Sequence, residues 1–220
     1  MAKLTDLGFL KGIIFEAIVS TYNQDGSPNA APMGTIMKNQ HLISLNVFNS
    51  SKTNCNLKAN KCAVINFTNN IEVFYKTTFK EVNPTGKLPQ EWFEKAETVN
   101  APKLQLSDAT IDISVLSMEP MGAEKTNFSC GIVKINVDKL YPKIYCRAMA
   151  MTLEAIIHAT RVKAFVNDYK QEKNVNALLE LIRNNSNVVN RVAPNSIYVT
   201  IIADLKKRID TWRNKRESTS

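Results

Sequence analysis

The stretch FNSSKTNCNL, residues 48–57, places two serines, a lysine and a threonine after an alternating apolar run and ahead of a helix-like segment. Hydroxyl groups, one ammonium group and the free backbone N–H groups of a helix start together suit a phosphate monoester. The same residue types are also ordinary helix caps. The stretch therefore predicts either a phosphate-binding helix start or a simple N-cap, and the sequence leaves both open.

Other chemistry-bearing patterns are absent from the sequence. It lacks GxGxxG, GxxxxGKS/T, GxSxG and HExxH, which disfavours dinucleotide and triphosphate folds. The cysteines at positions 55, 62, 130 and 146 form no CxxC pair, so we expect them to be reduced and mostly buried. The only histidines, His41 and His158, lie far apart and beside no cysteine, so no zinc site is expected. Any chemistry should come from a bound organic cofactor.

The formal charge of +8 raises the question of a nucleic-acid partner. Half of this excess lies in the last stretch, whose basic residues are Lys206, Lys207, Arg208, Arg213, Lys215 and Arg216. No recognition motif accompanies them, so we interpret this stretch as the solvated face of a last helix and expect no nucleic-acid partner. A weak contact between this helix and a polyanion is the alternative.

The beginning of the sequence does not read as a signal peptide. Asp6 and Lys11 interrupt its apolar run, and Glu16 follows that run without a small-residue cleavage site. No charge-free apolar stretch approaches the roughly 20 residues of a membrane helix. We therefore expect a cytoplasmic protein without a membrane partner.

The hydrophobic periodicity changes once along the chain. Up to about residue 140 it is typical of strands, expected at 12–22, 29–37, 41–48, 61–68, 109–122 and 128–141. Short helices are expected after residue 51 and at 69–79, the latter capped by Asn69 or Asn70. The segment 81–109 is expected to be largely loop, with one helical turn around Trp92.

The last third of the chain has helical periodicity, in segments 147–165, 174–192 and 196–215. In the first of these, an apolar side is marked by Met149, Leu153, Ile156, Ile157 and Ala164. The sequence thus predicts an α+β fold, with an antiparallel β-barrel domain over residues 10–140 and a C-terminal helical subdomain over residues 144–216.

The order of these segments resembles the archaeal-type FMN-binding split-barrel flavoproteins, long catalogued as a domain of unknown function. These are distant relatives of the flavin reductase and pyridoxamine-phosphate oxidase barrels. The stretches that carry the resemblance are EAIVSTYNQDGSPNAAPMG, SSKTNCNL, VINFTNNIEVFYKTTF and CRAMAMTLEAIIHATR. The resemblance implies an FMN-binding homodimer with each flavin in a groove between two split barrels.

The resemblance also assigns cofactor-binding residues. Ser51, Lys52 and Thr53 would hold the phosphate at the helix start, and Asn56 would support the ribityl chain or the loop. Asn49 is a further cofactor-binding candidate on the same stretch.

A second set of cofactor-binding candidates lies in the preceding strand. Ala31, Pro32, Met33 and Gly34 would pass close to the isoalloxazine ring. A flavin needs backbone N–H and C=O groups at its pyrimidine edge, and small residues permit close approach. A simple bulged strand is the alternative interpretation of these residues.

Four further residues are candidates near the site. Glu16 lies mid-strand and faces either the groove or, as we favour, solvent. His158 and Arg161 share one helix face with Glu154, which favours a polar network on that helix. The functional alternative is that His158, Arg161 or Arg147 reaches the substrate side of the flavin.

The predicted function is that of a flavin-reductase-like oxidoreductase which uses a small-molecule electron donor or acceptor. In such a protein the cofactor carries the chemistry and the chain supplies position and polarity. The first alternative is a non-catalytic FMN-binding or electron-carrier protein. The second is a binding module that uses the basic C-terminal helix.

Overall fold

The structure is a computed structural model that describes residues 3–137 and 144–217, and the side chains of these residues except 71, 75 and 215–217. The chain forms two compact units, Met1–Tyr145 and Cys146–Ser220. Among the described helices, none is long and apolar enough to cross a membrane.

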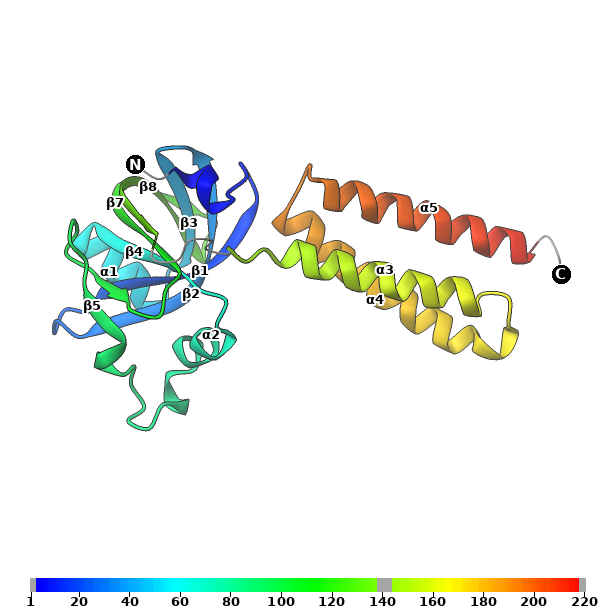
Figure 1. The fold of residues 1–220 in the computed structure, drawn as a ribbon, viewed down its shortest axis with the longest axis horizontal. Helices are drawn as coiled ribbons and strands as arrows, with labels where there is room; N and C mark the ends of the chain where they lie inside the picture. Colours follow the sequence, from blue (N-terminus) through cyan, green and yellow to red (C-terminus); the bar gives the residue numbers. More distant parts are fainter. Residues whose placement is uncertain (1–2, 138–143, 218–220) are drawn as a thin grey trace. The chain divides into compact units, whose positions relative to one another are not determined.

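The first unit is built on a closed antiparallel barrel with the strand order β1-β2-β3-β8-β7-β4 (Figure 1). Its strands are β1 (Ile14–Tyr22), β2 (Pro28–Asn39), β3 (Leu42–Phe48), β4 (Cys62–Phe67), β7 (Ala109–Met121) and β8 (Lys125–Val137). Their positions confirm the strands and the antiparallel barrel predicted from periodicity. The predicted strand 128–141 is described up to Val137, and its remaining residues lie outside the described part of the chain.

Two α-helices interrupt the strands of this unit, α1 (Lys52–Asn60) and α2 (Ile71–Thr78). The side chain of Asn70 caps α2, because its Oδ1 accepts a hydrogen bond from the Glu72 N–H at 3.0 Å. A short 3-10 helix, η1 (Leu4–Leu7), precedes the barrel.

The segment 81–109 contains more regular structure than the sequence predicted. It begins within η2 (Lys80–Val82) and holds the 3-10 turn η3 (Gln90–Trp92) and a two-stranded hairpin, β5 (Phe93–Lys95) and β6 (Pro102–Leu104). Strands of three residues are too short to show alternation, so the expectation of a largely unstructured segment was wrong for the hairpin.

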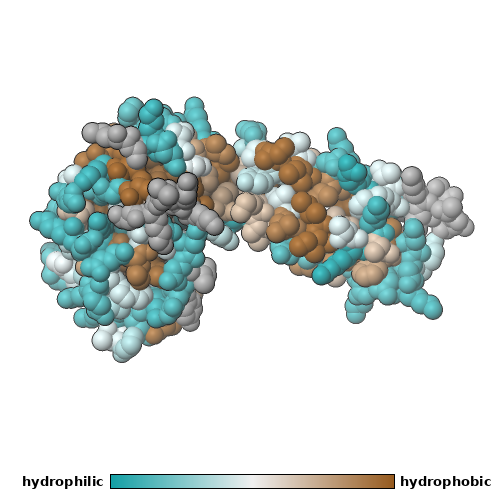
Figure 2. All heavy atoms as spheres, in the orientation of Figure 1, coloured by the Kyte–Doolittle hydropathy of each residue, from teal (hydrophilic) through white to brown (hydrophobic). Residues whose placement is uncertain are grey.

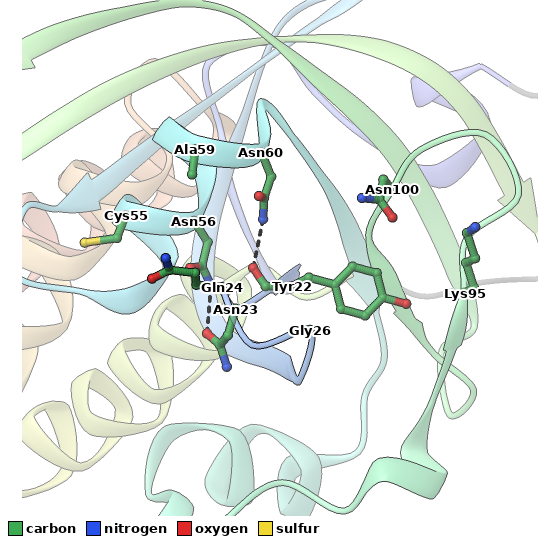
Figure 3. Close-up of a pocket in the computed structure, with 10 residues that line it drawn as sticks. All are labelled: Tyr22, Asn23, Gln24, Gly26, Cys55, Asn56, Ala59, Asn60, Lys95 and Asn100. Atoms are coloured by element: carbon green, nitrogen blue, oxygen red, sulfur yellow. Dashed lines mark hydrogen bonds between the residues drawn. The ribbon is translucent and has the colours of Figure 1, made fainter.

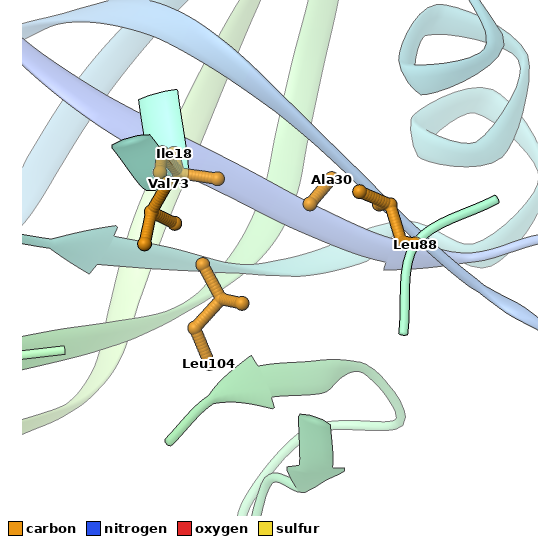
Figure 4. Packing of buried hydrophobic residues seen from close by; sticks show 5 residues of the cluster. All are labelled: Ile18, Ala30, Val73, Leu88 and Leu104. Atoms are coloured by element: carbon orange, nitrogen blue, oxygen red, sulfur yellow. The ribbon is translucent and has the colours of Figure 1, made fainter. Parts of the chain in front are cut away.

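An apolar cluster packs this segment and α2 against the barrel wall. Ile18 of β1 and Ala30 of β2 meet Val73 of α2, together with Leu88 and Leu104 (Figure 4). All five side chains are buried. The cluster therefore fixes α2, and the residues that follow it, beside the first two strands.

The second unit consists of α3 (Arg147–Phe165), η4 (Tyr169–Gln171), α4 (Glu172–Val192) and α5 (Ile197–Glu217). These bounds confirm the three predicted helices. A buried cluster joins them, formed by Ala159, Val162, Val175, Ile182 and Ile209.

The buried side of α3 is not the predicted one. Met149 and Leu153 are 64% and 57% exposed, whereas the buried residues are Ala148, Thr152, Ala155, Ala159 and Val162. Small side chains let neighbouring helices approach closely, so the larger apolar residues are left outside the contact. Figure 2 shows apolar residues on the visible surface of this unit.

Candidate functional site

The turn from β3 into α1 presents a capped helix start. The Ser51 hydroxyl accepts a hydrogen bond from the Asn54 N–H at 3.2 Å and donates one to the Phe48 carbonyl at 2.8 Å. Ser51 is therefore the N-cap residue that the sequence allowed. The backbone N–H groups of Lys52 and Thr53 have no acceptor within the described part of the chain. Two N–H donors thus remain available to an anion at this helix start.

A buried polar chain connects this helix start to two other elements. The Thr53 hydroxyl accepts a hydrogen bond from the Asn29 side chain of β2 at 3.0 Å. The Asn29 Oδ1 in turn accepts one from the Lys80 Nζ at 2.5 Å. Asn29 and Thr53 are both 1% exposed, so these groups depend on one another for hydrogen bonding. These hydrogen bonds hold Lys80 near the start of α1.

Sequence reasoning missed both Lys80 and Asn29. Lys80 follows α2 and is separated from Asn29 by 51 positions, so no local pattern joins them. The only available signal was the position of a lysine directly after a predicted helix.

Two lysines place positive charge at this helix start, and no described carboxylate balances it. Burial lowers the pKa of Lys80, and the nearby charge of Lys52 lowers it further. Among the residues whose side chains are described, neither lysine forms an ion pair, and the partner of Lys80 is the neutral Asn29 amide. Two mutually repelling ammonium groups beside free N–H donors favour a bound anion.

The neighbouring part of β2 has a free edge. β1 pairs with β2 from Pro28 to Ile36, but β3 pairs with it only from Thr35 onward. Residues 28–34 therefore have no strand partner on their second side within the described chain. The four ring-binding candidates, Ala31 to Gly34, lie on this free edge and are all half-exposed. Pro32, which has no N–H, suits such an edge.

The presence of glycine at position 34 has a structural explanation that sequence reasoning did not find. A Cβ atom at this position would lie 2.6 Å from the Cγ2 of Ile14 in β1. A larger residue at position 34 would therefore have to displace Ile14 or the strand, whatever approaches the other side of the strand.

Asn56 and Asn49 both make structural hydrogen bonds. The Asn56 Nδ2 donates to the Thr21 hydroxyl and to the Asn23 Oδ1, each at 3.0 Å, which ties α1 to the end of β1. The Asn49 Oδ1 accepts from the Thr126 hydroxyl at 2.7 Å, and its Nδ2 donates to the Ala123 carbonyl at 3.1 Å. Asn49 thus anchors the end of β3 to the β7–β8 turn.

The four candidates near the site are distributed over both units. Glu16 is half-exposed on β1, and its N–H donates to the Tyr145 carbonyl at 2.7 Å. Arg147, His158 and Arg161 all belong to α3. The His158 Nε2 lies 3.9 Å from the Glu154 carboxylate, which is the intrahelical contact expected for a polar network. Arg161 is exposed.

The cysteines differ from their expected burial. All four are free, but Cys55 is exposed, Cys62 and Cys146 are half-buried, and only Cys130 is buried. Burial raises the pKa of the Cys130 thiol to about 12, so this thiol is unreactive. The residue type alone predicted burial, and the sequence around each cysteine does not show whether its side chain faces the core. Within the described residues, no group of three or more His, Cys, Asp or Glu side chains could hold a metal ion.

The closed six-stranded antiparallel barrel of the first unit is a fold that this chain shares with solved structures. The model of the family described as protein of unknown function (DUF447), N-terminal domain, matches residues 15–135, and the chain belongs to this family. The resemblance predicted from the sequence is thereby confirmed. No curated protein matches the chain.

Two solved structures illustrate the similarity. An FMN-bound protein of the same family model from Methanosarcina mazei is 23% identical, with a TM-score of 0.54, over 93% of this chain and 98% of that one. Component B of nitrilotriacetate monooxygenase from Bacillus cereus is 17% identical, with a TM-score of 0.51, over 63% of this chain and 77% of that one. At these identities the similarity establishes the shared fold.

Proposed function

We propose that this chain is an FMN-binding flavoprotein whose phosphate site is the start of α1. The observation that carries the proposal is the convergence of Lys52 and Lys80 on a helix start with two free N–H groups. A phosphate dianion would neutralise both ammonium groups and accept both N–H hydrogen bonds. The M. mazei relative, described as FMN-bound, supports the same cofactor.

The residues present fit the remainder of FMN. The free edge of β2 offers backbone donors and acceptors for the pyrimidine edge of a flavin, and Ala31 adds little bulk there. The hydrogen bond from Asn29 to Thr53 holds this edge beside the phosphate site. Thr53 then acts by positioning the helix start, because its hydroxyl is already bonded to Asn29.

We further propose an oxidoreductase activity, with a small-molecule donor or acceptor of electrons. When bound, FMN would supply hydride or electron transfer, and the residues of the chain would bind and orient it. The two N–H groups and two lysines fix its phosphate, which leaves the ring at the half-exposed strand 31–34. The cofactor would thus be open to a small diffusing partner. A non-catalytic electron carrier is the second candidate, since the same site would serve it.

The proposed assembly is a homodimer in the cytoplasm. The outer half of β7, Leu116–Met121, extends beyond its pairing with β4, which ends at Ser114. Leu116 is 65% exposed on this extension, and Met118 and Met121 are also exposed. This part of β7 pairs with β8 on one edge and has no strand partner on the other within the described chain, and apolar side chains beside such an edge favour coverage by a second copy. Four free cysteines suit a reducing compartment.

Two measurements on purified protein test this function. The protein, loaded with FMN and freed of excess, should show a flavin absorption spectrum at one FMN per chain. Addition of NADH, NADPH or a reduced deazaflavin should bleach the spectrum if the protein is an oxidoreductase. A loaded protein that none of these donors bleaches would favour the electron carrier. A chain that retains no FMN would overturn the proposal.

The other alternative to a flavoprotein is a polyanion-binding module that uses α5. Two basic residues of α5 are engaged within their own unit, because Lys206 donates to Ser186 and Arg208 donates to Asp204. Colourless protein with salt-dependent nucleic-acid affinity would support this function.

A further inference from the structure

A second polar site lies along α1, beyond its first turn (Figure 3). It is a pocket of about 870 Å³ between the β1–β2 turn, the outer face of α1 and the hairpin segment 95–100. Its volume falls in the range of roughly 300–1,000 Å³ that small-molecule sites occupy. Ser51, Lys52 and Lys80 do not line it.

The lining of the pocket is dominated by side-chain amides, those of Asn23, Gln24, Asn56, Asn60 and Asn100. The Asn56 amide nitrogen donates to Asn23, and that of Asn60 donates to the Tyr22 carbonyl at 2.8 Å. These bonds fix the two α1 amides in place. The side chains of Gln24 and Asn100 make no hydrogen bond with any described residue, so their donors and acceptors are available.

The remaining chemistry of the pocket is one cation and one aromatic ring. The lining contains Lys95 and no carboxylate. Asp25, in the neighbouring turn, is occupied by the backbone and hydroxyl of Ser27. Figure 3 shows the half-exposed Tyr22 ring extending from β1 toward Lys95 and Asn100.

We propose that this pocket is a nucleotide-binding site, separate from the FMN phosphate site. The amides would pair with the donors and acceptors of a base and ribose. The Tyr22 ring would stack on the base, and Lys95 would hold the phosphate. An anionic, hydrogen-bond-rich and partly aromatic ligand matches all three features, whereas an apolar ligand would leave the amides unpaired and a cationic ligand would be repelled by Lys95.

A hydrogen-bonded path joins the two sites. Asn56, in the pocket wall, donates to the Thr21 hydroxyl, and the same hydroxyl accepts from Asn29 at 3.2 Å. Asn29 accepts from Lys80 of the proposed FMN phosphate site. The pocket is therefore a neighbour of that site, but it has its own cation, Lys95, and shares none of the residues Ser51, Lys52 and Lys80.

Calorimetric titration of the full chain with AMP tests the proposal. AMP should bind, and Lys95→Gln should weaken it about tenfold while leaving adenosine affinity unchanged. Asn100→Ala should weaken both ligands. The matched control is Lys38→Gln, which changes an exposed lysine outside the pocket and should have no effect.

A second set of titrations separates this pocket from the flavin site. Lys80→Gln should leave AMP affinity unchanged, and saturating FMN should not displace AMP. Absence of AMP binding, displacement of AMP by FMN, or a loss of AMP affinity in Lys80→Gln equal to that in Lys95→Gln would each overturn the proposal. A protein that binds AMP as expected but retains no FMN would support this pocket and contradict only the proposed function.

Discussion

At the residue scale, Lys80 combines features that a structural lysine rarely has. It is half-buried, its hydrogen-bond partner is a neutral amide, and a second lysine lies close enough to lower its pKa. Such an arrangement weakens the unliganded fold slightly and becomes favourable when an anion is bound. Ser51, by contrast, already has both of its hydrogen bonds within the chain.

The lowered pKa of Lys80 predicts a pH dependence of stability without flavin. The native state releases this proton at a lower pH than the unfolded chain, whose lysines titrate near 10.5. The Lys80 contribution to stability should therefore rise with pH between the lowered pKa and 10.5, whereas the raised pKa of the Cys130 thiol contributes in the opposite direction in every variant. Urea denaturation at several pH values should show that the difference in stability between wild type and Lys80→Gln grows with pH over this range, and that the difference between wild type and Lys38→Gln does not. Equal pH dependence of all three proteins would contradict the assignment.

The cap of α1 gives a second prediction at this scale. Ser51→Ala removes the side-chain acceptor of the Asn54 N–H and should lower the free energy of unfolding by about 1 kcal/mol. Ser50→Ala is the matched control, because Ser50 is exposed and precedes the cap. Denaturation midpoints that shift equally for the two variants would show that Ser51 does not cap the helix.

At the element scale, the packing of β2 on β1 depends on Gly34. In Gly34→Ala the new Cβ would overlap the Ile14 Cγ2 methyl, so we expect a loss of about 1–3 kcal/mol in stability. Ile14→Ala removes that methyl, and the added effect of Gly34→Ala should then nearly vanish. A double-mutant cycle by urea denaturation measures this coupling. If the stability losses of the two single variants simply add in the double variant, the Gly34→Ala loss does not come from contact with the Ile14 methyl.

The accuracy of the sequence prediction followed the length and pattern of each element. Long β-branched runs gave the barrel strands, and helical spacing gave α3 with its observed bounds, Arg147–Phe165. The β5–β6 hairpin was missed because three residues carry no periodicity. The buried side of α3 was wrong because alanines form the contact and Met149 faces outward.

Only the part of the candidate site that is formed by residues adjacent in the sequence was predictable. The stretch 48–57 gave the capped helix start with Ser51, Lys52 and Thr53 in one turn. Lys80 reaches it through Asn29, across 51 positions, by the packing of α2 on the barrel. Such a contact is a property of the tertiary fold and has no signature in a single sequence.

At the scale of the whole molecule, the open half of β7 predicts how two chains associate. Leu116→Lys places a charge on the proposed contact and should convert a dimer to a monomer. Leu10→Lys is the control, since Leu10 is 58% exposed and lies outside β7. Size-exclusion chromatography with light scattering gives the masses. A monomeric wild type, or a dimer that survives Leu116→Lys, would contradict this interface.

The central claim is that the start of α1 holds the phosphate of FMN, and the affinity ratio of FMN to riboflavin tests it most directly. Each charge-assisted hydrogen bond contributes about 1.5–3 kcal/mol, so wild-type protein should bind FMN roughly ten- to a hundredfold more tightly than riboflavin, or better. In a flavin-fluorescence titration, Lys80→Gln should lower FMN affinity about tenfold or more and leave riboflavin affinity unchanged. Equal affinities of the wild type for the two flavins, or equal losses in the variant, would contradict the phosphate site.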